Sequence, residues 1–137
     1  MKITRAALVA IQEHGEEGYP YEICGVMLGP RGSRGRVTET RRAKNTVVDR
    51  AHDRYEIDPR DLIRIEREAD AAGFEIVGYY HSHPDHPAQA SATDAQRSWA
   101  GPVYLIVAVH QGKAVDQNAF VAERDGGPMR GEDLEVG

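Results

Sequence analysis

A fourteen-residue stretch, residues 81–94, constrains this chain more than any other feature of its sequence. It follows an apolar run, residues 76–80, that is typical of a buried strand. His81 and His83 stand two positions apart, and strand side chains alternate, so both imidazoles should leave the same face of the strand at its end. The sequence therefore predicts two nitrogen ligands that converge from one rigid element, as a divalent metal requires.

The second half of the stretch adds a carboxylate. Pro84 should end the strand, and Ser91 should cap a helix that carries Asp94 in its first turn. Two histidines and one aspartate can then hold one ion and leave a fourth position for water, as in catalytic zinc sites. Taken alone, strand-end histidines are usually exposed polar residues, and a serine three positions before an acid is usually only a capping pair. The crowding of three histidines and two aspartates into fourteen residues favours the metal site.

These residues resemble the signature of the JAMM, or MPN-plus, metalloproteases. The matching positions are His81, His83, Pro84, Ser91 and Asp94. The family also carries a glutamate ahead of a Cys-Gly pair and an apolar strand, and Glu22 with residues 23–29 resembles that element. The resemblance covers most of the chain and implies that zinc is bound by His81, His83 and Asp94. It further implies that Glu22 is the general acid and base and that Ser91 helps to stabilise the oxyanion.

The residues around Glu22 also indicate what its carboxylate could do. It stands at the mouth of an apolar strand predicted over residues 22–28, where a solvated charge is the simpler interpretation. Beside a metal it becomes a candidate base, because the attacking water needs a carboxylate to take its proton. Cys24 lies inside the same strand and is expected to be buried and structural. As the only cysteine, it excludes an intramolecular disulfide and a multi-cysteine metal site.

The remaining elements follow from hydrophobic periodicity and turn residues. Helices are predicted over residues 4–18, 58–72 and 91–99, and strands over residues 22–28, 36–43, 54–57, 76–80, 103–109 and 114–122, with a polar loop over residues 45–52. This order indicates an α/β sandwich around a mixed sheet. The resemblance implies the three-layer, cytidine-deaminase-like architecture of the JAMM/MPN fold. One domain should cover residues 1–124, and residues 125–137, which are Gly-rich and acidic, should form a flexible tail.

Composition narrows the class of protein. Hydrophobic residues make up 40% of the chain and charged residues 28%, as in a globular domain. Apolar runs stay well below the roughly 20 residues of a membrane span, and the first residues lack a signal-peptide core, so a cytoplasmic location is expected. A net charge of −5 argues against general nucleic-acid binding. Five arginines could offer a basic surface to an acidic partner, although a solvated hairpin is the favoured interpretation: Arg31, Arg34, Arg36, Arg41 and Arg42.

The resemblance implies hydrolysis of an amide or isopeptide bond after the C-terminal glycine of a ubiquitin-like protein. The chain is similar to the stand-alone prokaryotic members and lacks room for the insertions of eukaryotic deubiquitinases. The expected partner is therefore a small ubiquitin-like or sulfur-carrier protein with a diglycine tail.

Two other functions stay open: a small-peptide or small-amide metallohydrolase, and a non-catalytic scaffold domain of the same fold. Scaffold members lack the metal ligands that this chain keeps. A zinc nucleoside deaminase would need a Pro-Cys-x-x-Cys element, which the single Cys24 excludes. His86 is expected outside the ligand set, and the oligomeric state is open, with a homodimer as one option.

Overall fold

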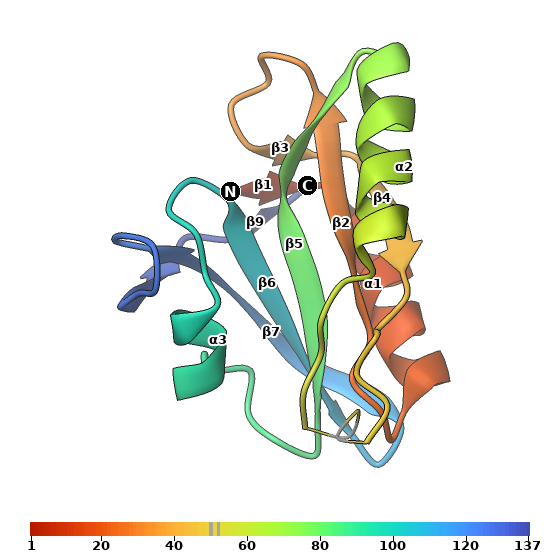
Figure 1. The fold of residues 1–137 in the computed structure, drawn as a ribbon, viewed down its shortest axis with the longest axis vertical. Helices are drawn as coiled ribbons and strands as arrows, with labels where there is room; N and C mark the ends of the chain where they lie inside the picture. Colours follow the sequence, from red (N-terminus) through yellow and green to blue (C-terminus); the bar gives the residue numbers. More distant parts are fainter. Residues whose placement is uncertain (50, 52) are drawn as a thin grey trace.

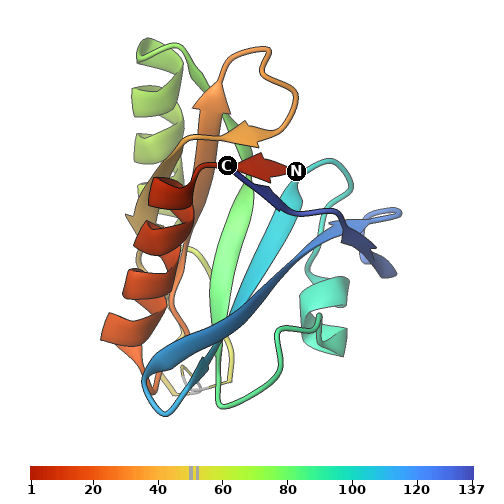
Figure 2. The same ribbon diagram turned by 180° about the vertical axis from the view of Figure 1, so that it is seen from behind.

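The computed structural model describes residues 1–49, 51 and 53–137, so positions 50 and 52 of the predicted polar loop lie outside the described residues. Figure 1 shows a six-stranded sheet with helices on both faces. Helix α1 (Arg5–Gly18) covers one face, whereas α2 (Pro59–Ala71) and α3 (Ala92–Gln96) lie on the other, as the reverse view in Figure 2 also shows. The predicted three-layer α/β sandwich is therefore confirmed.

The large sheet is mixed, as expected. Its strands lie in the order β4 (Glu39–Ala43), β2 (Cys24–Pro30), β5 (Phe74–Pro84), β6 (Val103–His110), β7 (Lys113–Ala122) and β8 (Met129–Glu132). Strands β5 and β6 pair in parallel, and the other neighbours run antiparallel. A small second sheet joins β3 (Arg36–Val37), β1 (Lys2–Ile3) and β9 (Glu135–Val136) in parallel.

The central strands are buried on both faces, which explains their continuous apolar sequence. In β2, Met27 packs in the core that Ile11 of α1 shares. Its neighbours Val26 and Leu28 point the other way and pack with Ile65 of α2. Successive strand side chains point to opposite faces, so one strand serves two cores.

The helix starts follow the predicted caps. The Thr4 hydroxyl accepts the backbone N–H of Ala7 at 3.2 Å at the start of α1. The Asp58 carboxylate accepts the N–H of Arg60 at 2.9 Å at the start of α2, with Pro59 as the first helical residue. Among the described residues, no helix is long and apolar enough to cross a membrane.

Two of the predicted strands differ from the structure. The strand expected over residues 36–43 is split at Thr38, whose N–H donates to the Leu28 carbonyl at 3.0 Å, so β3 pairs with β1 and only β4 pairs with β2. Residues 54–57 form no strand beyond an isolated bridge between Asn45 and Ile57. The Asn45 side chain forms hydrogen bonds with the backbone around it instead. Its Oδ1 accepts the N–H groups of Val47 and Glu56, and its Nδ2 donates to the carbonyls of Glu22 and Arg54.

Helix α3 ends earlier than the sequence predicts. It stops at Gln96 rather than at residue 99. Ser98 is buried, and both its N–H and its hydroxyl donate to the Ala95 carbonyl, at 3.1 Å and 2.6 Å. These bonds close the helix after little more than one turn, because the carbonyl is no longer free for a regular i+4 partner.

The C-terminal segment, residues 125–137, carries strands β8 and β9 where the sequence predicts a flexible tail. Strand β8 extends the large sheet beside β7, and β9 pairs with β1. The Met1 amino group also donates to the Asp133 carbonyl at 2.6 Å. These contacts join the two ends of the chain, so local composition could not reveal them.

Candidate metal centre

The two histidines of the motif lie near the end of β5 and are buried in the protein. His81 is 1% exposed and His83 is 9% exposed. They pair with Ile106 and Ala108 of the parallel strand β6, which fixes their spacing. Both side chains point to the face on which α3 lies, because Asp94 of α3 reaches both rings, as the alternation of strand residues predicts.

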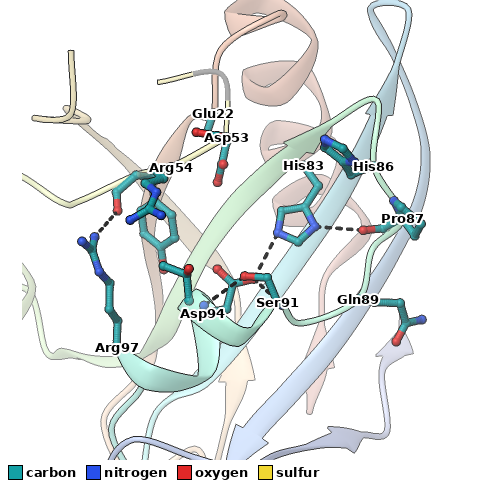
Figure 3. A pocket seen from close by; sticks show the side chains of 12 residues that line it. Glu22, Asp53, Arg54, His83, His86, Pro87, Gln89, Ser91, Asp94 and Arg97 are labelled. Atoms are coloured by element: carbon teal, nitrogen blue, oxygen red, sulfur yellow. Dashed lines mark hydrogen bonds and ion pairs between the residues drawn. The ribbon is translucent and has the colours of Figure 1, made fainter. Parts of the chain in front are cut away.

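The ring nitrogens of these histidines converge on Asp94. The Nε2 atoms of His81 and His83 lie 3.2 Å apart. Asp94 Oδ1 is 3.2 Å from the first and Oδ2 is 3.1 Å from the second. A Glu22 carboxylate oxygen and one ring nitrogen of each histidine lie within 4.8 Å of one another. Figure 3 shows His83, Asp94, Ser91 and Glu22 around the resulting pocket.

His83 is oriented by a second hydrogen bond. Its Nδ1 lies 2.8 Å from the Pro87 carbonyl oxygen. Because a carbonyl only accepts, Nδ1 carries a proton, and Nε2 is the nitrogen that faces Asp94. Histidines that bind metals are commonly held in this way by a partner on the far nitrogen.

His81 also stacks on an aromatic ring. Its ring lies on that of Tyr55, with centroids 4.2 Å apart and planes inclined by 21°. Its Nδ1 is buried and has no hydrogen-bond partner within the described part of the chain. Its Nε2 is therefore the nitrogen that takes part in the cluster.

Asp94 and Ser91 form the capping box of α3. The Ser91 N–H donates to Asp94 Oδ2 at 2.9 Å, and the Asp94 N–H donates to Ser91 Oγ at 3.0 Å. The predicted capping pair is thus present, and the same carboxylate also reaches both histidines. Ser91 Oγ accepts in this pair, so its hydroxyl can still donate to a group in the pocket that it lines.

The protonation of the cluster follows from burial and these contacts. Burial alone would raise the pKa of Asp94, but hydrogen bonds from His81, His83 and the Ser91 N–H hold that pKa well below its usual range. Burial lowers the pKa of His81. Burial would also lower the pKa of His83, but its hydrogen bond with Asp94 outweighs this and the pKa is raised. Burial raises the pKa of Glu22 to about 8.

The donor set fits a divalent cation. Two imidazole nitrogens and an ionised carboxylate face one point, which is the nitrogen and oxygen ligation that zinc accepts. Two carboxylates compete for the third place, since Glu22 also lies within reach of both histidines. Asp94 is the closer one, with an oxygen 3.1–3.2 Å from each Nε2 atom. Glu22 still has a carboxylate oxygen within 4.8 Å of one ring nitrogen of each histidine.

Glu22 is placed by its neighbours along the backbone. The sequence predicts it inside a strand, but β2 begins at Cys24, so Glu22 lies just before it. Its carbonyl accepts from Asn45 Nδ2 at 3.0 Å. The next residue, Ile23, donates its N–H to Ser82 Oγ at 3.0 Å. These contacts hold the Glu22 backbone while its side chain stays buried, at 6% exposure.

Sequence reasoning did not single out Ser82, Asn45 or Tyr55. Ser82 could have been noticed, because it is a polar residue between two histidines in a strand whose other face is apolar. Asn45 and Tyr55 lie in a loop that is far from the motif in sequence, and the sequence carries no signal of their contacts.

The structure also shows the surroundings of His86, of Cys24 and of the arginine-rich hairpin. His86 is exposed and lines the pocket, but lies outside the cluster. Cys24 is fully buried, and burial raises its pKa to about 12, as expected of a structural cysteine. In the arginine-rich hairpin, Arg31, Arg41 and Arg42 pair with Asp70, Glu39 and Glu17, which agrees with a solvated hairpin rather than a free basic surface.

The chain matches a known protein family over most of its length. Residues 4–122 match the family Prok-JAB, described as prokaryotic homologs of the JAB domain. The chain is 39% identical over 102 residues to a desampylase of Haloferax volcanii, a match that covers 71% of this chain and 72% of that protein. It is 33% identical over 95 residues to the CysO-cysteine peptidase of Mycobacterium tuberculosis, covering 69% of this chain and 63% of that protein.

Solved structures share the fold. A protein from Desulfitobacterium hafniense superposes with a TM-score of 0.84 at 25% identity, over 99% of this chain and 92% of that chain. A JAB1/MPN domain protein from Archaeoglobus fulgidus superposes with a TM-score of 0.65 at 20% identity, over 100% of this chain and 97% of that chain. The second likeness concerns the fold alone.

Proposed function

The chain belongs to the Prok-JAB family and is a hydrolase of the JAMM type, and from this premise we propose that it is a zinc enzyme that cleaves the bond after the C-terminal glycine of a ubiquitin-like or sulfur-carrier protein. The observation that carries the proposal is the convergence of His81 Nε2 and His83 Nε2 on the Asp94 carboxylate, with Glu22 beside them. The names of two relatives, desampylase and CysO-cysteine peptidase, support this class of substrate.

The zinc ligands in this proposal are His81, His83 and Asp94. Asp94 stays ionised because its pKa is held low, and the Pro87 carbonyl keeps the proton of His83 on Nδ1. With zinc bound, both Nε2 atoms would be free of protons, so the two imidazoles and the carboxylate would present lone pairs to the ion. When bound, zinc supplies Lewis acidity toward the scissile carbonyl and toward the attacking water.

Glu22 carries the proton in this mechanism. It takes a proton from the attacking water, whose oxygen forms the new bond to the glycine carbonyl carbon. As the C–N bond breaks, Glu22 returns the proton to the leaving amine nitrogen. A carboxyl group whose pKa is raised to about 8 can both accept and donate near neutral pH, which supports this role.

Ser91 is assigned to the oxyanion. Its hydroxyl oxygen is occupied by the Asp94 N–H at 3.0 Å, so its hydrogen is free for an oxygen that gains charge in the pocket. A donor of this kind contributes about 3 kcal/mol to transition-state stabilisation in comparable sites.

The substrate in this proposal presents an extended diglycine tail. Strand β4 is an edge of the large sheet, and its last residue, Ala43, pairs with Cys24, which lies close to Glu22 in the chain. A tail added along β4 would be guided toward the site by backbone hydrogen bonds. Glycines suit this path because they need no side-chain room.

The test is cleavage of a carrier protein fused through Gly-Gly to a reporter. Cleavage should stop when zinc is chelated and return when zinc is restored. Replacing the penultimate glycine by a bulky residue should lower kcat/KM. Equal kcat/KM for both tails, or equal cleavage of short Gly-Gly peptides, would favour a small-amide hydrolase. No cleavage with zinc bound would favour a scaffold domain.

A further inference from the structure

Two guanidinium groups line the pocket beside the metal centre. Arg54 and Arg97 come from segments far apart in sequence, yet both border the same cavity of about 310 Å³. Figure 3 shows them together on one side of the pocket, with His83, His86 and Pro87 on the other. The mechanism proposed above uses neither arginine.

Arg97 is held in place by the loop that packs on the metal centre. It is the residue at the C-terminal end of α3, and its Nη1 donates to the Tyr55 carbonyl at 3.1 Å. Tyr55 in turn stacks on His81. The guanidinium is therefore tied to the residue next to a metal ligand, and its remaining N–H groups stay available to a ligand in the cavity.

Among the residues that the structure describes, the Arg54 side chain has fewer hydrogen-bond partners than that of Arg97. Its backbone carbonyl accepts from Asn45 Nδ2 at 3.1 Å, which fixes the main chain at this position. Its side chain is half-buried and makes no hydrogen bond or ion pair with another residue in the described ranges 1–49, 51 and 53–137. Guanidinium groups at such positions commonly bind carboxylates, because their planar fork can donate two parallel hydrogen bonds.

The pocket is lined by acidic side chains as well as by the two arginines. Asp53 and Asp94 also line the cavity, so an anionic substrate would be repelled by these two side chains if no cations were present. Two guanidinium groups on one wall provide a place where a second negative charge can sit without approaching these carboxylates. The pocket can therefore accept a substrate that carries a carboxylate close to its scissile bond.

Two kinds of carrier adduct differ in this respect. In a C-terminal amino-acid adduct, the free α-carboxylate is attached to the carbon that bears the leaving nitrogen, so it lies within the same small pocket as the reacting bond. In an isopeptide, the leaving nitrogen ends a flexible lysine side chain and no free carboxylate is near it. The two kinds of substrate therefore differ in how far the nearest free carboxylate lies from the scissile bond.

We propose that Arg54 and Arg97 form a carboxylate-binding subsite on the leaving-group side of the scissile bond. The inference rests on the proposed carrier hydrolase function and narrows it. The preferred substrate is a carrier whose diglycine tail ends in an amino acid with a free α-carboxylate. Lysine isopeptides are the poorer substrates.

The test compares a Gly-Gly-alanine carrier that ends in a free acid with the same carrier ending in a carboxamide. The wild-type protein should cleave the acid with a kcat/KM about tenfold to 100-fold higher, the range expected for charge-assisted hydrogen bonds. Arg54→Gln and Arg97→Gln should lose this preference mainly by slower cleavage of the acid, with the carboxamide little changed. Arg130→Gln is the matched control, because Arg130 is exposed on β8 outside the cavity.

Binding gives a readout that does not depend on turnover. In a Glu22→Gln background, calorimetry should show tighter binding of the acid than of the carboxamide, and Arg97→Gln should remove the difference. Equal affinity for both tails, or equal losses on both tails in the arginine variants, would overturn the subsite. A preference in binding without any cleavage by the wild-type protein would instead reject the proposed hydrolase function and retain the subsite.

Discussion

Ser82 and Ile23 are joined by two reciprocal hydrogen bonds. The Ile23 N–H donates to Ser82 Oγ at 3.0 Å, and the Ser82 N–H donates to the Ile23 carbonyl at 3.1 Å. Ser82 stands between His81 and His83, and Ile23 directly follows Glu22. This pair of bonds therefore sets the position of the proposed base relative to the two histidines.

Replacing Ser82 by alanine should weaken this link. The Ile23 N–H would lose its acceptor, at a cost of about 1–3 kcal/mol in the free energy of unfolding. Glu22 would be less well placed, so we expect kcat to fall by roughly tenfold with zinc content unchanged. Urea unfolding, metal analysis and steady-state kinetics measure the three quantities.

The control for this variant is Thr4→Ala. Thr4 also accepts a backbone N–H through its hydroxyl, but it does so at the start of α1. The Thr4→Ala variant should lose about 1 kcal/mol in the free energy of unfolding and keep the wild-type kcat. A Ser82→Ala enzyme that behaves like Thr4→Ala would show that Ser82 contributes only to stability.

His83 and His86 provide a matched pair for the metal centre. His83→Ala removes a nitrogen that lies 3.1 Å from Asp94, and we expect the purified variant to lose most of its zinc. His86 lines the same pocket but lies outside the cluster, so His86→Ala should keep zinc at the wild-type level. Metal analysis after dialysis decides between them, and full zinc content in His83→Ala would reject the ligand set.

His14 should make stability depend on pH. Its Nδ1 lies 2.8 Å from the Tyr80 hydroxyl, and burial lowers its pKa from 6.5 to about 4. The unfolded chain therefore takes up a proton at His14 before the folded protein does. The contribution of neutral His14 is fully present above pH 6.5 and is lost as the pH falls toward 4.

Urea unfolding of wild type and His14→Gln at pH 7 and pH 5 measures this effect. The wild type should lose roughly 1–2 kcal/mol more than the variant between these two pH values. Equal losses would show that His14 titrates alike in the folded and unfolded chain.

Much of the site could be predicted from short-range patterns. The two-residue spacing of His81 and His83 fixes a common face once the strand is recognised, and β5 has that geometry. The spacing of Ser91 and Asp94 fixes a helix start, and the capping box forms as expected. These features depend on neighbours within a few residues, which the sequence displays directly.

The parts that could not be predicted depend on distant contacts. Residues 54–57 have backbone hydrogen bonds to the side chain of Asn45 where the sequence predicts bonds to a neighbouring strand. The C-terminal strands exist because β9 pairs with β1 at the other end of the chain. Tyr55 stacks on His81 although a helix and most of a strand separate them in sequence. Composition and periodicity carry no information about such pairings.

Glu22→Gln removes the proposed base with little change in shape. The amide can still occupy the buried position, so the fold and the zinc content should stay as in wild type. Turnover should fall by about 10²–10⁴-fold, the usual contribution of general acid–base catalysis. Activity within a few-fold of wild type would assign the proton transfer to another group.

The most direct test of the central claim is a zinc titration of the metal-free protein while cleavage of a Gly-Gly carrier fusion is followed. We predict that cleavage is absent without metal and rises in proportion to added zinc until each chain holds one ion. The Asp94→Ala variant should show no such rise at the same zinc concentrations. Cleavage by the metal-free protein, or a wild-type curve that Asp94→Ala reproduces, would contradict a zinc site built on His81, His83 and Asp94.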